Sequence, residues 1–166
     1  MIIIIEGIDR VGKTTLANRL SEKFNIPIYK QERIGGNDKT SQDISLQNYI
    51  RAKSLVEFWN WDGFNQHIIM DRFHWTESVY SIVERDDIEQ TRRMRNVEGD
   101  MLKQKDKYFI IHVMPVDIKW CNKQHGSNLN KHQNEFDKLY DESRLNKKKC
   151  TYYSFELVEK TISEML

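Results

Sequence analysis

The stretch IIIIEGIDRVGKTT, residues 2–15, decides the fold that this sequence predicts. Its four consecutive isoleucines favour a strand covered on both faces, as in a parallel sheet between two layers of helices. After the stretch, Leu16, Ala17, Leu20 and Phe24 recur at the spacing of one helix face. The sequence therefore predicts a strand, a glycine-containing loop and a helix in direct succession.

The loop between that strand and that helix, GIDRVGKT, matches the phosphate-binding pattern G-x-x-x-x-G-K-[ST] in the context that the pattern requires. Gly7 and Gly12 let backbone N–H groups approach phosphate oxygens, and the helix N-terminus adds partial positive charge. Lys13 supplies a point charge for the β- and γ-phosphates, and Thr14 supplies a hydroxyl group for Mg²⁺. The motif indicates binding of a nucleoside triphosphate with magnesium.

The 166-residue chain is 39% hydrophobic and 31% charged with a formal net charge of +1, which predicts one globular domain over residues 1–166. No apolar run approaches the roughly 18–20 residues that span a bilayer, and Glu6 interrupts the isoleucines. We therefore expect no membrane segment, no signal peptide and a cytoplasmic location. The balanced charge argues against duplex nucleic acid as a partner. Cys121 and Cys150 form no CxxC pair, so no redox site is indicated.

Strands and helices are predicted to alternate along the rest of the chain. This alternation predicts an α/β fold, a three-layer α/β/α sandwich of the P-loop type with a mostly parallel, five-stranded sheet. Apolar periodicity and turn signals predict further strands over residues 26–29, 67–70, 108–114 and 150–153. Helices are predicted over residues 41–61, 75–84 and 86–104, with a last helix that has Ser154 as its N-cap.

Two polar segments lack strong periodicity. The segment of about residues 119–132 contains a glycine and many polar side chains, and we expect it to form a mobile lid. This lid segment contains no arginine. The run Lys147–Lys149 is interpreted as a solvated connection, which is the usual role of a short charge run.

Four basic residues, Arg10, Lys13, Arg33 and Arg72, lie at or just beyond the carboxyl ends of predicted strands. Ligands bind at this edge of an open α/β sheet, so we expect these cations to face one site. An arginine pairs with two phosphate oxygens through its planar guanidinium group and keeps its charge. Since phosphoryl transfer depends on positioning and electrostatics, the arrangement favours a site between a donor and an acceptor phosphate.

The longer string IEGIDRVGKTT resembles the opening of thymidylate kinases, and the DRF of residues 71–73 resembles that family's D-R-[YH] motif. Thr76 stands where serine is usual, Tyr80 stands at the downstream aromatic, and the likeness runs from residue 2 to about residue 80. The resemblance implies a P-loop nucleoside monophosphate kinase that uses ATP and Mg²⁺. The short chain, rich in Ile, Lys and Asn, has the style of a phage- or virus-encoded relative.

The resemblance also implies roles for the residues of these motifs. Catalysis falls to Arg10, Lys13 and Arg72, with Arg10 as the catalytic cation of the subgroup that has an arginine in its phosphate loop. Thr14 and Asp71 are expected to hold the metal. The residues expected to bind ATP are Gly7, Asp9, Val11, Gly12, Lys13, Thr14 and Thr15.

On the acceptor side, the resemblance implies that Asp9 accepts a hydrogen bond from the 3′-hydroxyl group and that Arg33 and Arg72 bind substrate near its phosphate. Arg51 is expected near the base, and Tyr80 beside the sugar, where it would exclude a ribose 2′-hydroxyl group. The expected reaction transfers the ATP γ-phosphoryl group to a deoxynucleoside 5′-monophosphate, dTMP or a related pyrimidine nucleotide. A homodimer, as in that family, is left open.

Other functions stay open at this point. A deoxynucleoside kinase would use an acid after the second strand, here Glu32, to deprotonate a 5′-hydroxyl group. A nucleic-acid kinase would need a basic, aromatic-lined channel, which the balanced charge does not favour. A nucleotide-binding module without chemistry is disfavoured because the motif residues are intact. The base is open too, since Gln47 falls near the place of the family's thymine-stacking aromatic.

Overall fold

Five parallel strands form the central sheet of the computed structural model, which describes residues 1–30 and 41–166. The strands are β1 (Ile2–Glu6), β2 (Ile28–Lys30), β3 (Ile68–Asp71), β4 (Tyr108–Val113) and β5 (Asn146–Cys150). Their order in the sheet is β2-β3-β1-β4-β5, so β1 lies in the middle. Every residue of β1 is buried, as predicted for a strand covered on both faces.

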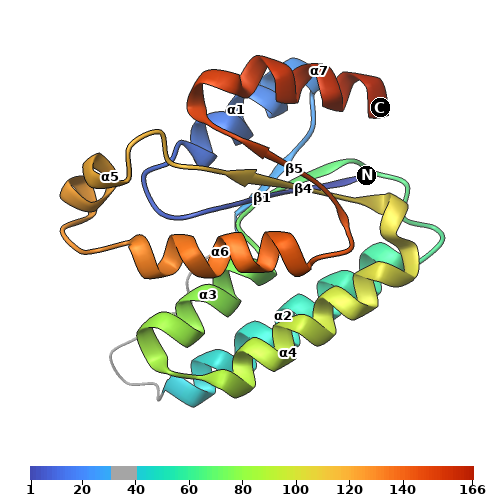
Figure 1. The fold of residues 1–166 in the computed structure, drawn as a ribbon. Helices are drawn as coiled ribbons and strands as arrows, with labels where there is room; N and C mark the ends of the chain where they lie inside the picture. Colours follow the sequence, from blue (N-terminus) through green and yellow to red (C-terminus); the bar gives the residue numbers. More distant parts are fainter. Residues whose placement is uncertain (31–40) are drawn as a thin grey trace.

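Helices cover both faces of this sheet (Figure 1). One face carries α1 (Lys13–Phe24) and α7 (Phe155–Met165). The opposite face carries α2 (Ser41–Asn60), α3 (His74–Arg85), α4 (Ile88–Met101) and α6 (Asn130–Glu142). The remaining described helical elements are the short helix α5 (Ile118–His125) and two 3-10 segments, η1 (Leu102–Lys107) and η2 (Tyr152–Ser154). This three-layer α/β/α architecture confirms the predicted fold class.

A continuous apolar core fills the space between the layers. In it, Trp59 packs against Phe73 and Tyr108 with ring centroids 5.4 and 6.5 Å apart. The Tyr108 hydroxyl group donates to Asn60 Oδ1 at 2.7 Å, so this polar atom has a partner where the ring is buried. Within residues 1–30 and 41–166, no helix is both long and apolar enough to cross a membrane.

The predicted position of the fifth strand is wrong. The sequence favours residues 150–153, whereas β5 is Asn146–Cys150 and Tyr152–Ser154 is a 3-10 turn. The strand lies at the sheet edge and contains the lysine run that was interpreted as a solvated connection. Lys147 donates to the Tyr140 carbonyl group, so its ammonium group is satisfied at the edge. Lysines suit edge strands because they oppose pairing with other chains.

Two helix boundaries also refine the sequence-based expectations. The helix predicted over residues 86–104 ends earlier, because α4 stops at Met101 and Gln104 has the non-helical angles φ −135° and ψ 51°. The last helix begins where predicted, with Ser154 at the N-cap position. However, the Ser154 hydroxyl group donates to the Thr151 carbonyl group and does not cap α7.

The predicted lid segment, about residues 119–132, is largely helical. Asp117 accepts hydrogen bonds from two backbone N–H groups in the first turn of α5, and Gly126 ends that helix with a left-handed φ of 78°. Buried Cys121 and Leu129 pack this segment onto the core. Its capacity to move as a lid stays a prediction.

Candidate active site

The loop between β1 and α1 has the backbone geometry of an anion-binding turn. Gly7 and Gly12 have φ values of 140° and 95°, and Arg10 between them has φ 69°. A Cβ atom at Gly7 would collide with the Val113 carbonyl oxygen on β4, so only glycine fits this position. α1 begins at Lys13, and its free N–H groups therefore lie at the loop, where a phosphate group binds favourably.

Lys13 is 4% exposed and points into the middle of the loop. Its ammonium group donates to the Ile8 carbonyl oxygen and lies 3.9 Å from Asp9 Oδ1. Burial, together with the positive charge of Arg72, lowers the pKa of Lys13 to about 8, against the attraction of nearby carboxylates. Phosphate oxygens would add to the negative charge that these carboxylates supply to the buried cation.

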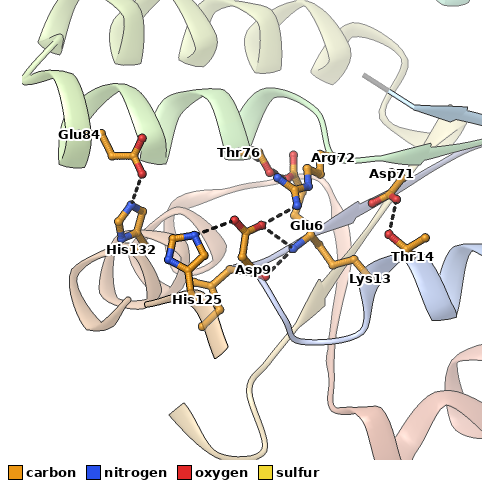
Figure 2. Close-up of polar contacts among 11 residues, drawn as sticks. Glu6, Asp9, Lys13, Thr14, Asp71, Arg72, Thr76, Glu84, His125 and His132 are labelled. Carbon is orange, nitrogen blue, oxygen red and sulfur yellow. Dashed lines mark hydrogen bonds and ion pairs between the residues drawn. The ribbon is translucent and has the colours of Figure 1, made fainter. Parts of the chain in front are cut away.

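Asp71, at the carboxyl end of β3, faces the loop from the neighbouring strand. Its Oδ2 accepts a hydrogen bond from Thr14 Oγ1 at 2.8 Å (Figure 2). Its Oδ1 is buried and, among the described residues, has no hydrogen-bond partner. An unpaired, buried carboxylate oxygen beside a threonine hydroxyl group fits Mg²⁺, which prefers oxygen ligands and keeps several waters. Thr14 and Asp71 are therefore the side chains that could hold the metal.

Arg72 follows directly and has a left-handed backbone with φ 77°. Its Nη2 donates to Asp9 Oδ1 at 2.5 Å, which joins the loop to the end of β3. The turn after Arg72 is held by Glu6, whose two carboxylate oxygens accept backbone hydrogen bonds from Phe73, Trp75 and Thr76 at 3.0–3.1 Å. Burial raises the pKa of Glu6.

Glu6 is a functional residue that the sequence reasoning missed. Besides the three backbone groups, its carboxylate accepts a hydrogen bond from the Thr76 hydroxyl group at 2.5 Å. It thereby caps the start of α3, since Phe73 at the N-cap position has no capping side chain. The sequence does contain a signal for this role, a glutamate directly after four isoleucines. A carboxylate at the end of a fully buried strand needs hydrogen-bond donors around it.

A cavity of about 720 Å³ opens at this edge of the sheet and brings most of the predicted residues together. His125 of α5 and Lys30 of β2 also line it, and the sequence reasoning assigned a role to neither. His125 Nε2 lies 3.3 Å from Asp9 Oδ2 (Figure 2). The described residues that line it are Asp9, Arg10, Gly12, Lys13, Thr14, Thr15, Lys30, Asp71, Arg72 and His125.

A second cavity, of about 620 Å³, lies against the loop and is mostly apolar. Trp120 of α5 and Tyr152 of the 3-10 turn before α7 line it, and each is about half exposed, 51% and 52%. Arg10 lines both cavities. The sequence reasoning missed this aromatic lining because its residues come from two distant segments. Within residues 1–30 and 41–166, its lining is Arg10, Val11, Gly12, Thr15, Val116, Asp117, Trp120, Cys121, Tyr152 and Tyr153.

Two predicted substrate residues lie away from the cavities, and a third is not among the described residues. Arg51, on α2, donates to the Tyr29 hydroxyl group at 2.6 Å and lines neither of the two cavities. Tyr80, on α3, is 8% exposed and packs on the His132 ring with centroids 4.8 Å apart. Arg33, like the alternative base Glu32, lies outside the described residues.

The fold and the loop define the structural class of this chain. It has the three-layer P-loop α/β/α fold, with a G-x-x-x-x-G-K-[ST] loop between β1 and α1, and it shares this fold with solved structures of nucleotide and nucleoside kinases. Over 123 residues the chain is 31% identical to the SPbeta prophage-derived uncharacterized protein YorR of Bacillus subtilis strain 168. The match spans 71% of this chain and 65% of YorR, just under two thirds of that protein. No protein-family model matches the chain.

Solved structures superpose on almost the whole chain. YorR of Bacillus subtilis in complex with phosphorylated GDP gives a TM-score of 0.70 and 18% identity, covering 99% of this chain and 95% of YorR. Deoxyadenosine kinase from M. mycoides, with products dCMP and dCDP, gives a TM-score of 0.65 and 17% identity, covering 99% of this chain and 100% of the kinase chain. Thymidylate kinase from Candida albicans gives a TM-score of 0.60 and 17% identity, covering 99% of this chain and 89% of the kinase chain. At these identities the likeness establishes the fold.

Proposed function

We propose that the chain is an ATP-dependent phosphotransferase whose acceptor is a deoxynucleoside 5′-monophosphate, with dTMP or a related pyrimidine nucleotide as the first candidate. One observation carries this proposal: among the described residues, five basic side chains and two acidic ones line the cavity beside the loop. Such an excess of cations suits two phosphate-bearing ligands that meet end to end. The basic residues are Arg10, Lys13, Lys30, Arg72 and His125.

The donor phosphates would bind along the loop. Backbone N–H groups at the start of α1 and the Lys13 ammonium group face the position of the β- and γ-phosphates. The donor base then falls into the second cavity, where the Trp120 and Tyr152 rings offer surfaces for stacking. This cavity and the phosphate cavity share Arg10, Gly12 and Thr15, so one nucleotide can occupy both.

Thr14 and Asp71 would hold Mg²⁺ between the donor phosphates and the carboxyl end of β3. The ion would neutralise charge on the β- and γ-phosphates. The buried Asp71 Oδ1, which has no partner among the described residues, supports this assignment. Asp71 is 7% exposed, so its position is set by the fold before any ligand binds.

The protein's part in the transfer is electrostatic. An oxygen of the acceptor phosphate attacks the γ-phosphorus, and ADP leaves with the electron pair of the broken bond. The acceptor oxygen is already anionic, so no general base is needed. Arg10, Lys13 and Arg72 would face the charge that moves between the two nucleotides, and fixed cations at such a position lower the barrier.

A deoxynucleoside kinase is the second candidate. The superposition on the full length of deoxyadenosine kinase from M. mycoides favours it, and its acceptor is then a 5′-hydroxyl group that requires a base. The formal net charge of +1 gives no support to a nucleic-acid acceptor. The intact cation set of the phosphate cavity argues against a nucleotide-binding module without chemistry.

A panel assay tests the proposal. ADP release is measured with Mg-ATP and with nucleosides and nucleoside monophosphates, each in the ribo and deoxy form. We expect turnover with a deoxynucleoside monophosphate and none with the matching nucleoside, and a Lys13→Ala variant lowers that turnover by at least about 100-fold. Turnover with nucleosides alone establishes the second candidate. Background rates with every acceptor, together with tight ATP binding, contradict both.

A further inference from the structure

The phosphate cavity is closed on its α5 side by a single side chain among the described residues. All other lining residues belong to the loop and α1, to the end of β2, or to the end of β3. His125, in the last turn of α5, reaches across to the loop, with Nε2 3.3 Å from Asp9 Oδ2 (Figure 2). Among the described residues that line this cavity, His125 is the one that comes from the second half of the chain.

A hydroxyl group fixes the orientation of this ring. His125 Nδ1 lies 2.6 Å from Ser127 Oγ, just beyond the end of α5. When the neutral ring carries its proton on Nε2, the Ser127 hydroxyl group donates to Nδ1, and the Nε2–H bond points at Asp9. In that tautomer the ring directs its Nε2–H donor toward the loop side of the cavity.

Asp9 is the common partner of several basic side chains. Its Oδ1 accepts from Arg72 at 2.5 Å and lies 3.9 Å from the Lys13 ammonium group, while Oδ2 faces His125. One carboxylate therefore faces three groups that can donate to a phosphate. A phosphoryl group that enters this space brings more negative charge than Asp9 has, and it competes for the same donors.

The contribution of His125 to the packing of α5 is small. Its side chain is 27% exposed, whereas Cys121 and Leu129 in the same segment are 2% and 0% exposed and supply the apolar contacts. The imidazole ring lies at the cavity, with Nδ1 against Ser127 Oγ and Nε2 against Asp9 Oδ2.

We propose that His125 is a substrate-contacting residue whose Nε2 donates to an oxygen of the phosphoryl group that is transferred, in place of its contact with Asp9. This inference rests on the proposed function, because it assumes that the γ-phosphate of ATP enters the cavity. With this contact, α5 takes a direct part in the transfer. The sequence shows no sign of such a part, since residues 119–132 contain no arginine. Ser127 acts as a positioning residue through the imidazole ring.

The test compares ATP with ADP, since only ATP has the γ-phosphate. Affinities of both nucleotides with Mg²⁺ are measured calorimetrically for the wild type and for His125→Ala, His125→Gln and Lys123→Ala. We expect His125→Ala to lower the affinity for ATP by about tenfold and the affinity for ADP by less than about twofold. His125→Gln retains an N–H donor and recovers part of the loss. Lys123→Ala, an exposed change on the same helix, controls for general charge.

Turnover gives a second readout with the acceptor found in the panel. We expect His125→Ala to lower kcat by about 100-fold with little change in the acceptor KM, and Ser127→Ala to lower kcat by about threefold. If His125→Ala lowers the affinities for ATP and ADP equally, or if it matches the wild type in both affinity and turnover, the inference is overturned and the proposed function stands. A wild type that turns over no acceptor but discriminates ATP from ADP through His125 supports the inference and contradicts the proposed acceptor. A wild type that does not bind ATP overturns both.

Discussion

Two arginines at the candidate site have a backbone conformation that glycine usually adopts. Arg10 and Arg72 have φ values of 69° and 77°. A non-glycine residue in this region costs about 1 kcal/mol, and such residues gather at functional sites. Here the strained positions direct one guanidinium group from the loop and one from the end of β3 toward the same cavity. At both residues the backbone geometry serves the placement of a cation.

Arg10 is expected to act on turnover more than on ATP affinity. It is exposed and lines the phosphate cavity, so its guanidinium group can face the charge that moves from donor to acceptor. We predict that Arg10→Ala lowers kcat by about 10²–10³-fold and changes the KM for ATP by less than about threefold. Steady-state kinetics measures both constants. Unchanged turnover in this variant would remove Arg10 from the catalytic set.

Lys13 is expected to give ATP binding an alkaline limit. Its pKa is lowered to about 8 because the ammonium group is buried and lies near Arg72. Only the charged form attracts phosphate, so affinity stays constant below pH 8 and falls as pH rises above it. We predict a loss of about tenfold between pH 7 and pH 9, with proton uptake on binding at the higher pH.

A Lys13→Arg variant is the control for this pH dependence. The guanidinium group keeps its charge at pH 9, so the variant retains its pH 7 affinity even if that affinity is lower than in the wild type. Calorimetry in buffers of different ionisation enthalpy measures the proton uptake. A loss at pH 9 of equal size in wild type and variant would assign the effect to another group.

Glu6 is expected to stabilise the fold and to position Arg72. Each of its carboxylate oxygens accepts two hydrogen bonds, so the amide group in Glu6→Gln places N–H against other donors. We predict a loss of about 2–3 kcal/mol in the free energy of unfolding, together with reduced turnover. Chemical denaturation measures the first, and the ADP-release assay measures the second.

The matched control is Glu159→Gln on α7. Glu159 is 7% exposed and pairs with the exposed side chains of Arg19 and Lys23. We predict a smaller loss than in Glu6→Gln and unchanged turnover, because both partners can turn to water when the charge of Glu159 is removed. Equal losses of unfolding free energy in the two variants would mean that the four hydrogen bonds to Glu6 stabilise the fold no more than the ion pairs of Glu159 do.

At the scale of elements, local sequence signals predict the part of the site formed by β1, the loop and α1, and they miss the part contributed by α5. The strand, loop and helix of residues 2–24 are encoded by contiguous residues, so periodicity and the glycine pattern suffice. β5 was misplaced because its Lys147–Lys149 run reflects an edge position, which depends on the strand order. His125 and Trp120 were missed because their importance arises only when α5 packs near the loop.

The aromatic pair of the second cavity is expected to bind the donor base. Trp120 on α5 and Tyr152 before α7 each present a half-exposed ring beside the loop. Stacking of a base on an aromatic side chain contributes about 1–3 kcal/mol, so Trp120→Ala should raise the KM for ATP at least about fivefold while kcat changes little. Steady-state kinetics at saturating acceptor measures this effect.

Trp61→Ala provides the comparison for Trp120→Ala. Trp61 follows α2, is 63% exposed and lines neither cavity. The variant removes the same ring from the surface, and we expect wild-type kinetics from it. An equal rise in the KM for ATP in both variants would place the base outside the second cavity.

At the scale of the whole molecule, the parallel topology explains why the site forms. β1 and β3 are neighbours and end at the same edge of the sheet, so the loop and the Asp71–Arg72 pair meet although more than sixty positions separate them. The formal net charge of +1 conceals this local concentration of basic side chains. The sequence could therefore predict a phosphate site, whereas the acceptor depends on side chains that the fold gathers from distant segments.

The most direct measurement follows the γ-phosphoryl group itself. ATP labelled in the γ-phosphate is incubated with Mg²⁺, the wild-type chain and each deoxynucleoside monophosphate, and the products are separated. We predict that the label appears in a deoxynucleoside diphosphate, in equal amount to the ADP formed, and that Lys13→Ala abolishes its appearance. Label recovered only as inorganic phosphate or in unreacted ATP, with every monophosphate tested, would contradict phosphoryl transfer to a nucleoside monophosphate at this site.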